Sequence, residues 1–259
     1  MKIVSAIAIF IIILFIVGVK AIHMTSKAKK EDVIANIKKA TFILLLPDPN
    51  KQGMPVEIGT AFFISPDGYI ITANHVIKDK KENDEIILQQ PVELGKPPVL
   101  VHNIELVEKW PKYDLALLKA DFDKNRNKAF LNGKDSFDYI GIDFLQHCEG
   151  EEVYAYGFPL AKAPTVNNRG ELIVAWQSFS PRLTSAIISS TYNYIGHIKT
   201  SHDTKYYTID KSLHYGNSGG PIILKDSGKA IAVCIEFQPV NIPQIDGSIV
   251  TTQSQYSIA

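Results

Sequence analysis

The chain has 259 residues, of which 46% are hydrophobic and 21% are charged, a composition typical of a globular body with one large domain or two half-domains. Lysine plus arginine and aspartate plus glutamate both total 27, so the formal net charge is zero. Proteins that bind nucleic acids or other polyanions usually contain more basic than acidic residues. The balanced charge therefore argues against nucleic-acid binding.

The first 22 residues are not expected to belong to the globular body. The stretch Ile3–Val19 is apolar apart from Ser5 and Gly18, and a helix over it spans about 25 Å, near the lower limit for crossing a bilayer. A signal-peptide core is shorter, ~7–15 residues. The sequence therefore predicts a transmembrane anchor over residues 1–22, and the alternative is a signal peptide cleaved near Val19-Lys20-Ala21.

A linker over residues 23–40 connects this segment to the body. Its part Ser26–Ala40 is rich in Lys, Ala, Glu and Ile, which predicts a short amphipathic helix or a spacer. The apolar segment is preceded by Lys2 and the terminal amine and is followed by four lysines, Lys20, Lys27, Lys29 and Lys30. By the positive-inside rule, this distribution alone would keep the C-terminal side in the cytoplasm.

From residue 41 onward, short apolar or alternating runs are separated by turn residues, and this predicts an all-β body over residues 41–250 with a tail at 251–259. The runs expected to form strands are Thr41–Leu46, Thr60–Ile64, Tyr69–Thr72, Glu85–Leu88, Val99–Val107, Leu115–Lys119, Glu152–Tyr156, Ser185–Ser190, Lys205–Ile209, Pro221–Leu224 and Ala230–Phe237. Many short strands at this spacing are typical of barrels or sandwiches. The polar stretch Asp121–Ser136 separates an N-terminal half, about 41–125, from a C-terminal half, about 138–250.

Three segments carry residues suited to nucleophilic catalysis. The hairpin Gly59–Ile77 ends in a small-residue turn that holds His75, and Asp114 stands at the start of an apolar strand. In Gly216–Pro221, glycines flank Ser218, which permits tight backbone conformations and lets a carbonyl approach. Taken singly, these are a surface histidine, a strand-start aspartate and a glycine-rich turn. In the order His, Asp, Ser on an all-β background, they match the chymotrypsin-type triad.

At this point the sequence resembles the trypsin/chymotrypsin superfamily, and within it the high-temperature-requirement (Deg) type. The resemblance covers about residues 57–237 and is carried by Thr72–Val76, Asp114–Leu118, Tyr156–Pro159, Thr208–Asp210 and Gly216–Pro221. It implies two antiparallel six-stranded β-barrels with the active site between them. The first barrel would supply His75 and Asp114, and the second would supply Ser218.

The sequence departs from the family pattern at three places. Asn74 stands where the family usually has a small residue before the histidine. Asn217 replaces the aspartate that receives the freed N-terminus in animal digestive enzymes, so activation by that salt bridge is not expected. The chain ends soon after residue 240, so the PDZ domain that the Deg branch often carries is not expected either.

The resemblance implies a serine endopeptidase that acts on proteins or peptides through an acyl-enzyme, without a metal or cofactor. Ser218 would be the nucleophile, His75 its base and Asp114 the carboxylate that orients the base. The backbone N–H groups of Gly216 and Ser218 would bind the oxyanion. The resemblance also favours a body outside the cytoplasm, periplasmic or at the cell surface, although the lysines that follow the apolar segment favour the cytoplasmic side. The oligomeric state is left open.

Residues Ser212–Tyr215 precede the nucleophile and are expected to line one wall of the S1 pocket. Ser212 is neutral where an acidic residue would favour Arg or Lys, so an apolar or small P1 residue is expected. His214 either contacts a bound side chain or fills the wall, beside Tyr215. Glu236 would narrow the pocket or repel acidic side chains.

The main alternative is a catalytically silent relative that serves as a membrane-tethered binding or chaperone-like module. A serine esterase of the α/β-hydrolase type is excluded, because its histidine follows the serine and the last histidine here is His214. The other histidines lack metal-ligand spacing, and Asp79, Asp84 and Asp143 are interpreted as loop charges. Two cysteines, Cys148 and Cys234, are too few for a disulfide scaffold or a zinc site. They are interpreted as small hydrophobic residues or, alternatively, as one disulfide.

Overall fold

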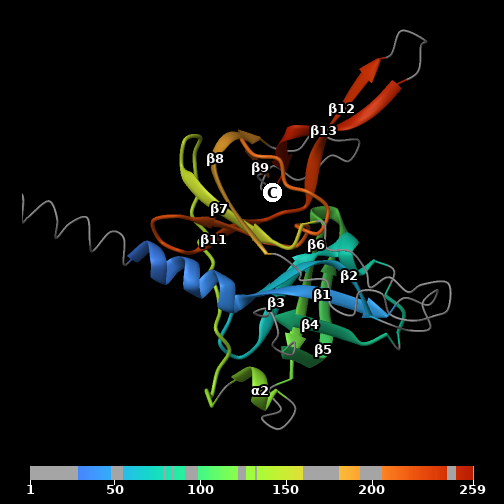
Figure 1. The fold of residues 1–259 in the computed structure, drawn as a ribbon, viewed down its shortest axis with the longest axis vertical. Helices are drawn as coiled ribbons and strands as arrows, with labels where there is room; N and C mark the ends of the chain where they lie inside the picture. Colours follow the sequence, from blue (N-terminus) through green and yellow to red (C-terminus); the bar gives the residue numbers. More distant parts are fainter. Residues whose placement is uncertain are drawn as a thin grey trace, which may run out of the picture.

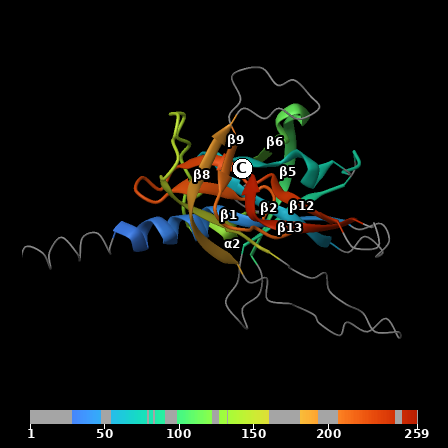
Figure 2. The ribbon, with the colours of Figure 1, turned by 90° about the horizontal axis from the view of Figure 1, so that it is seen from above.

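The computed structural model describes residues 29–47, 55–78, 80–82, 84–90, 99–121, 127–131, 133–159, 181–192, 206–243 and 249–258. Its two β units pack against each other, and a helix of residues 29–40 lies at one side of them (Figures 1 and 2). The predicted anchor of residues 1–22 lies outside the described residues. Within the described ranges, no helix has both the length and the apolar character needed to cross a membrane.

The first unit is a closed six-stranded barrel, as the sequence predicts, and its strand order is β1-β2-β3-β6-β5-β4. Its strands are β1 (Thr41–Pro47), β2 (Pro55–Phe63), β3 (Tyr69–Ala73), β4 (Ile86–Gln90), β5 (Val99–Trp110) and β6 (Leu115–Ala120). One-turn 3₁₀ helices follow β3 (η2, Asn74–Ile77) and β5 (η3, Pro111–Tyr113). The strands alternate as expected for a filled barrel: in β6, Ala116, Leu118 and Ala120 are fully buried.

A group of aromatic rings packs together in the core of this barrel. Phe42 and Phe63 meet edge to face with ring centroids 5.3 Å apart, and Phe63 stacks on Phe137 at 4.4 Å. Phe130 of the short helix α2 (Lys128–Leu131) packs against the same rings. The polar stretch between the two halves thus contributes to the core, since both Phe130 and Phe137 come from it or directly follow it.

The second unit is a seven-stranded antiparallel sheet with the order β11-β10-β7-β8-β9-β13-β12. Its strands are β7 (Glu152–Gly157), β8 (Arg182–Tyr192), β9 (Tyr206–Ile209), β10 (Pro221–Leu224), β11 (Ala230–Val233), β12 (Glu236–Pro243) and β13 (Ile249–Ile258). In the described residues this sheet does not close, so the prediction of a second six-stranded barrel is not met there. Residues 251–258 lie in β13 and not in a tail, because this β-branched segment pairs with both β9 and β12.

The predicted strand Ala230–Phe237 is divided into β11 and β12. The interruption lies at Cys234, whose backbone leaves the strand ladder and bonds to the loop between β9 and β10. Its N–H donates to Gly220 O at 2.8 Å, and its carbonyl accepts from the N–H of Gly219 at 2.7 Å. The strand therefore breaks where its backbone supports the loop that contains Ser218.

A hydrophobic cluster joins the two units and the helix of residues 29–40. On the helix, Ile37 and Ala40 are fully buried, and on the units the cluster includes Phe62 of β2 and Tyr156 of β7. The remaining buried members come from β1, β4, β7, β10, β11 and the chain on either side of β7. Because the contact between the units is built as a packed core, loops of the second unit have a fixed position relative to the first.

Candidate active site

His75 and Asp114 are brought together by the pairing of β3 with β6. In this antiparallel pair Ala73 lies opposite Leu115, so the residues just after β3 meet the residue just before β6. The N–H of Asn74 donates to the carbonyl of Asp114 at 2.8 Å, which continues the pairing by one residue. The position of His75 next to Asp114 thus follows from strand register.

The Asp114 carboxylate binds His75 at two points. Oδ2 lies 2.6 Å from Nδ1 of the imidazole, and Oδ1 accepts the backbone N–H of His75 at 2.8 Å. A carboxylate at Nδ1 fixes the tautomer that carries its proton there, and this leaves Nε2 free to accept a proton. Both side chains remain partly accessible, 41% for His75 and 28% for Asp114.

Asp114 itself has a left-handed backbone, with φ 52° and ψ 39°. It ends the 3₁₀ turn that reverses the chain between β5 and β6, and its N–H donates to Pro111 O at 3.2 Å. Few residues other than glycine and Asn or Asp adopt this conformation readily. An aspartate thus satisfies both the turn and the histidine contact.

Ser218 lies in a tight loop between β9 and β10 whose glycines have positive φ values, 96° at Gly216 and 86° at Gly219. Asn217, buried between them, donates to His214 O twice, from its backbone N–H and from Nδ2, each at 3.0 Å. Its carbonyl accepts the N–H of Gly220 at 2.8 Å. These bonds fix the peptide planes on either side of Asn217.

Two amide donors of this loop have no acceptor within the part of the chain that the structure describes. Among the described residues, the N–H groups of Gly216 and Ser218 donate to no other group. The carbonyl of Asn217 points toward Gly220, and the N–H of Ser218, on the opposite edge of the same peptide, points the other way. Two free donors that flank an occupied one form the arrangement expected for an oxyanion site.

The barrel holds this loop through Gly59 and Thr60. The N–H of Thr60 donates to the carbonyl of Ser218 at 2.8 Å. A Cβ on Gly59 would lie 2.8 Å from Ser218 O and equally close to the methyl carbons of Val76, the neighbour of His75. The backbone of Ser218 is therefore separated from the histidine turn only by the backbone of Gly59.

Within the described residues, no hydrogen bond links the Ser218 hydroxyl to His75. Bonds between a nucleophile and its base are often long before a substrate binds. The hydrogen bonds of the described residues therefore join His75 to Asp114 directly, and the backbone of the barrel places Ser218 beside them.

The predicted substrate-binding residues lie on both sides of this loop. Ser212 is half-buried, while His214 and Tyr215 are exposed on the segment that leads to Ser218, and Tyr215 has 71% of its surface accessible. Glu236 begins β12 and pairs with Ile258, and its side chain lies outside the described residues. Their roles in specificity stay predictions.

Thr60 is a site residue that the sequence does not single out. Its hydroxyl donates to Gly216 O at 2.6 Å, and its carbonyl accepts the hydroxyl of Thr72 at 2.8 Å. Both threonines are fully buried. Two buried threonines at the ends of apolar runs, next to Gly59 and Ala73, are the only signal the sequence offers for these contacts.

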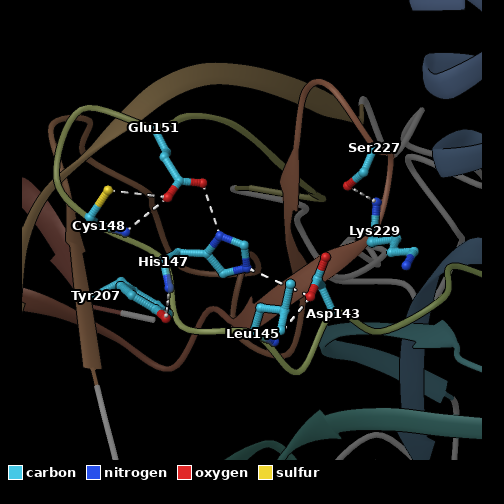
Figure 3. Close-up of polar contacts among 8 residues, drawn as sticks. All are labelled: Asp143, Leu145, His147, Cys148, Glu151, Tyr207, Ser227 and Lys229. Atoms are coloured by element: carbon cyan, nitrogen blue, oxygen red, sulfur yellow. Dashed lines mark hydrogen bonds and ion pairs between the residues drawn. The ribbon is translucent and has the colours of Figure 1, made fainter.

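A second group of titratable side chains lies in the loop before β7 (Figure 3). His147 is nearly buried, with Nδ1 2.9 Å from Glu151 and Nε2 3.9 Å from Asp143, and its N–H donates to Tyr207 OH at 3.4 Å. Asp143, predicted to be a loop charge, is only 14% accessible because it faces this histidine. Within the described ranges, no three metal-binding side chains are placed to hold an ion.

Both cysteines are free. Burial raises the pKa of Cys234 to about 12. Cys148 is exposed, and its pKa is raised chiefly by its hydrogen bond to the Glu151 carboxylate, 3.4 Å from Sγ. The disulfide that the sequence left open is therefore not formed.

Comparison with known proteins agrees with this geometry. A family model described as a trypsin-like peptidase domain matches residues 59–233. A probable periplasmic serine endoprotease, DegP-like, of Bartonella henselae is 31% identical over 180 residues, which are 69% of this chain and 28% of that protein. A protein of the same description from Rhizobium meliloti is 30% identical over 64% of this chain and 25% of its own length. The chain thus spans about a quarter of the length of the curated relatives it matches.

Two solved structures share the fold. The HtrA-type protease AlgW with a decapeptide has a TM-score of 0.56 at 17% identity, over 88% of this chain and 62% of that one. Deg5 has a TM-score of 0.53 at 17% identity, over 81% and 85% of the two chains. On the family match over residues 59–233, and with these DegP- and HtrA-type neighbours, the chain belongs to the trypsin-like peptidase family.

Proposed function

We propose that this protein is a serine endopeptidase that hydrolyses peptide bonds through an acyl-enzyme, with Ser218 as nucleophile, His75 as general base and Asp114 as the residue that orients the base. The proposal rests on the two-point contact between the Asp114 carboxylate and His75, at 2.6 Å and 2.8 Å. Membership in the trypsin-like peptidase family supports it. The glycine-flanked serine beside this pair is the nucleophile that the arrangement needs.

The proposed reaction has two halves. A serine hydroxyl is a weak nucleophile at neutral pH, so Nε2 of His75 takes its proton as Ser218 Oγ attacks the peptide carbonyl. Asp114 stabilises the imidazolium, which then gives the proton to the leaving amine as the C–N bond breaks. Water, activated by the same imidazole, hydrolyses the ester and restores the free serine.

The negative oxygen of each tetrahedral intermediate would bind the N–H groups of Gly216 and Ser218. Both donors are free among the described residues, and the bonds made by Asn217 fix the peptides around them. Donors that are already in place need no reorganisation during the reaction, and losing one typically costs ~10²–10³-fold in kcat.

Substrates are proposed to be proteins or peptides with an apolar or small P1 residue. The neutral side chain of Ser212 supports this choice, and His214, Tyr215 and Glu236 are the further candidates for the substrate-binding walls. Profiling on a peptide library tests the preference, and a dominant cleavage after Arg or Lys would contradict it.

The body is proposed to work outside the cytoplasm, because relatives are described as periplasmic proteases. Residues 1–22 would anchor it in the membrane or, if cleaved, release it. Labelling intact cells with a membrane-impermeant amine reagent shows whether the body lies outside or inside the cytoplasm, and labelling of the body is expected. Protection of the body would instead support the orientation that the lysines after residue 19 predict.

The central test compares the full-length protein in detergent with its Ser218→Ala variant. Each is incubated with casein and, separately, with a fluorophosphonate probe. Cleavage and labelling by the parent alone are expected. If the folded parent does neither, the alternative of a silent binding module is favoured, while labelling without cleavage would indicate a competent site with narrow specificity.

A further inference from the structure

We infer that Thr60 is a positioning residue: its side chain, on the first β unit, holds the Gly216 carbonyl and thereby orients the oxyanion donors on the second. The inference rests on the proposed peptidase function. Thr60 touches neither the substrate nor the reacting atoms and would act through the loop that carries Ser218.

Three hydrogen bonds meet at Thr60, and two of them cross between the units. Its hydroxyl donates to Gly216 O at 2.6 Å, and its N–H donates to Ser218 O at 2.8 Å. Its own carbonyl accepts from Thr72 at 2.8 Å. One residue of the barrel therefore binds the carbonyls of both residues whose amides would form the oxyanion site.

The loop lies in close contact with Thr60 and Thr72. A Cβ on Gly219 would lie 2.0 Å from the carbonyl oxygen of Thr60 and 2.3 Å from the hydroxyl of Thr72. A Cβ on Gly157 would lie 3.1 Å from the hydroxyl of Thr60 and 2.6 Å from Oδ1 of Asn217. Gly219 of the loop and Gly157 of β7 thus both pack against Thr60 without room for a side chain, as a fixed register between the units requires.

Gly216 is the residue that most needs an external constraint. A glycine populates positive and negative φ with similar ease, so the chain by itself does not select the value of 96° seen here. The Thr60 hydroxyl supplies a constraint, because it holds the Gly216 carbonyl, and with it the peptide between Gly216 and Asn217, toward the barrel. Rotation of that carbonyl would break this bond and also turn the N–H of Asn217 away from His214.

Thr60→Val and Thr60→Ser separate the hydroxyl from the shape of the side chain. Valine keeps the volume without a donor, whereas serine keeps the donor without the methyl group. Thr41→Val is the matched control, because Thr41 is also buried in the barrel and its hydroxyl has no partner among the described residues. For each variant, kcat, KM and the rate of fluorophosphonate labelling are measured with the full-length protein, on a peptide that the parent cleaves.

Thr60→Val is expected to lower kcat and the labelling rate by roughly 10-fold or more, less than the loss of an oxyanion donor itself, with KM within ~3-fold of the parent. Thr60→Ser should restore most of the rate, and Thr41→Val should match the parent. A parental kcat in folded Thr60→Val overturns the inference. If that variant does not fold, Thr60→Cys, a weaker donor of similar size, must show the same loss or the inference fails.

The outcome of this test is separable from that of the proposed function. If the parent neither cleaves nor labels, the peptidase proposal fails first. If the parent is active and Thr60→Val equals it in kcat and labelling rate, only the role of Thr60 is lost. A purely structural role would lower the melting temperature of Thr60→Val and leave kcat per labelled site unchanged.

Discussion

Asp114 binds His75 with both carboxylate oxygens, one on the imidazole and one on the backbone N–H. The second bond ties the carboxylate to the same residue whose ring it orients, so the ring and its partner separate only if both contacts break. With a contact to Nδ1 alone, the carboxylate and the ring could rotate together, whereas the bond to the backbone N–H fixes the carboxylate in place. The two-point contact converts strand register into a fixed imidazole orientation.

Asp114→Asn is expected to lower kcat by ~10⁴-fold, as in enzymes of known triad mechanism. The amide can still accept the N–H of His75, but its NH₂ group would favour the tautomer protonated at Nε2, which cannot take the proton of Ser218. Peptide hydrolysis at pH 8 measures the loss.

The matched control for Asp114→Asn is Glu85→Gln. Glu85 makes a similar contact to Nδ1 of His102, at 2.9 Å, on an exposed part of the barrel. It should leave kcat unchanged. An Asp114→Asn variant with kcat near that of the control would contradict the role of Asp114.

Gly219→Ala is expected to destabilise the protein by about 3 kcal/mol or more, because the new methyl group adds overpacking to a strained backbone. The added carbon would lie 2.0 Å from the carbonyl oxygen of Thr60. Gly133→Ala is a close control, since its φ of 83° is nearly the 86° of Gly219 but no atom lies within 4 Å. It should cost about 1 kcal/mol for backbone strain alone.

Urea denaturation of both variants measures the difference between their free energies of unfolding. Because the two positions have nearly the same φ, the excess for Gly219 reports the contact between the loop and the barrel. Equal losses for the two glycines would mean that the loop can move away from Thr60 at little cost, which would also weaken the argument for a fixed oxyanion site.

The sequence predicts the His75–Asp114 pair well, for a physical reason. Two apolar strands of nearly equal length, Tyr69–Ala73 and Leu115–Ala120, pair in antiparallel register, and the residues at their adjoining ends must then meet. The same alternation predicts short strands that form a barrel or a sandwich, and the choice of a six-stranded barrel comes from the resemblance to the trypsin/chymotrypsin superfamily.

The open second sheet and the role of Thr60 do not follow from local pattern. The division of Ala230–Phe237 depends on the Cys234 backbone bonding to Gly219 and Gly220, which is a contact between distant segments. From the sequence, Thr60 is an ordinary strand residue. Its hydroxyl finds its partner, the carbonyl of Gly216 156 residues away, only because the two units pack against each other. Local propensity carries no information about such partners.

The carboxylate of Glu151 is expected to stabilise the loop before β7 at neutral pH. The N–H of Cys148 and then His147 hold the pKa of Glu151 below its ordinary value. A carboxylate with a lowered pKa contributes stability above its unfolded pKa, about 4.3, and this contribution is lost as the pH falls through the folded value. Glu151→Gln should therefore be less stable at pH 7 and lose less stability on acidification below about pH 4.3.

Thermal unfolding at a series of pH values between neutral and acid tests the Glu151 prediction. Glu105→Gln is the control, because Glu105 is exposed on β5 and makes no polar side-chain contact with described residues. Its profile should follow the parent. If the Glu151→Gln profile also runs parallel to the parent at all pH values, the carboxylate does not contribute in the way proposed.

The two cysteines are expected to differ in reactivity toward iodoacetamide in the folded protein. Cys234 is buried with a pKa of about 12, so it should stay unmodified at pH 8, while exposed Cys148 should react. The Glu151 hydrogen bond raises the pKa of Cys148, so Glu151→Gln should speed its alkylation by increasing the thiolate fraction. Mass spectrometry of timed samples should show one adduct in the native state and two after unfolding in urea. Modification of Cys234 at the rate of Cys148 in native protein would mean that the β11–β12 junction opens, and with it the support that Cys234 gives to the Ser218 loop.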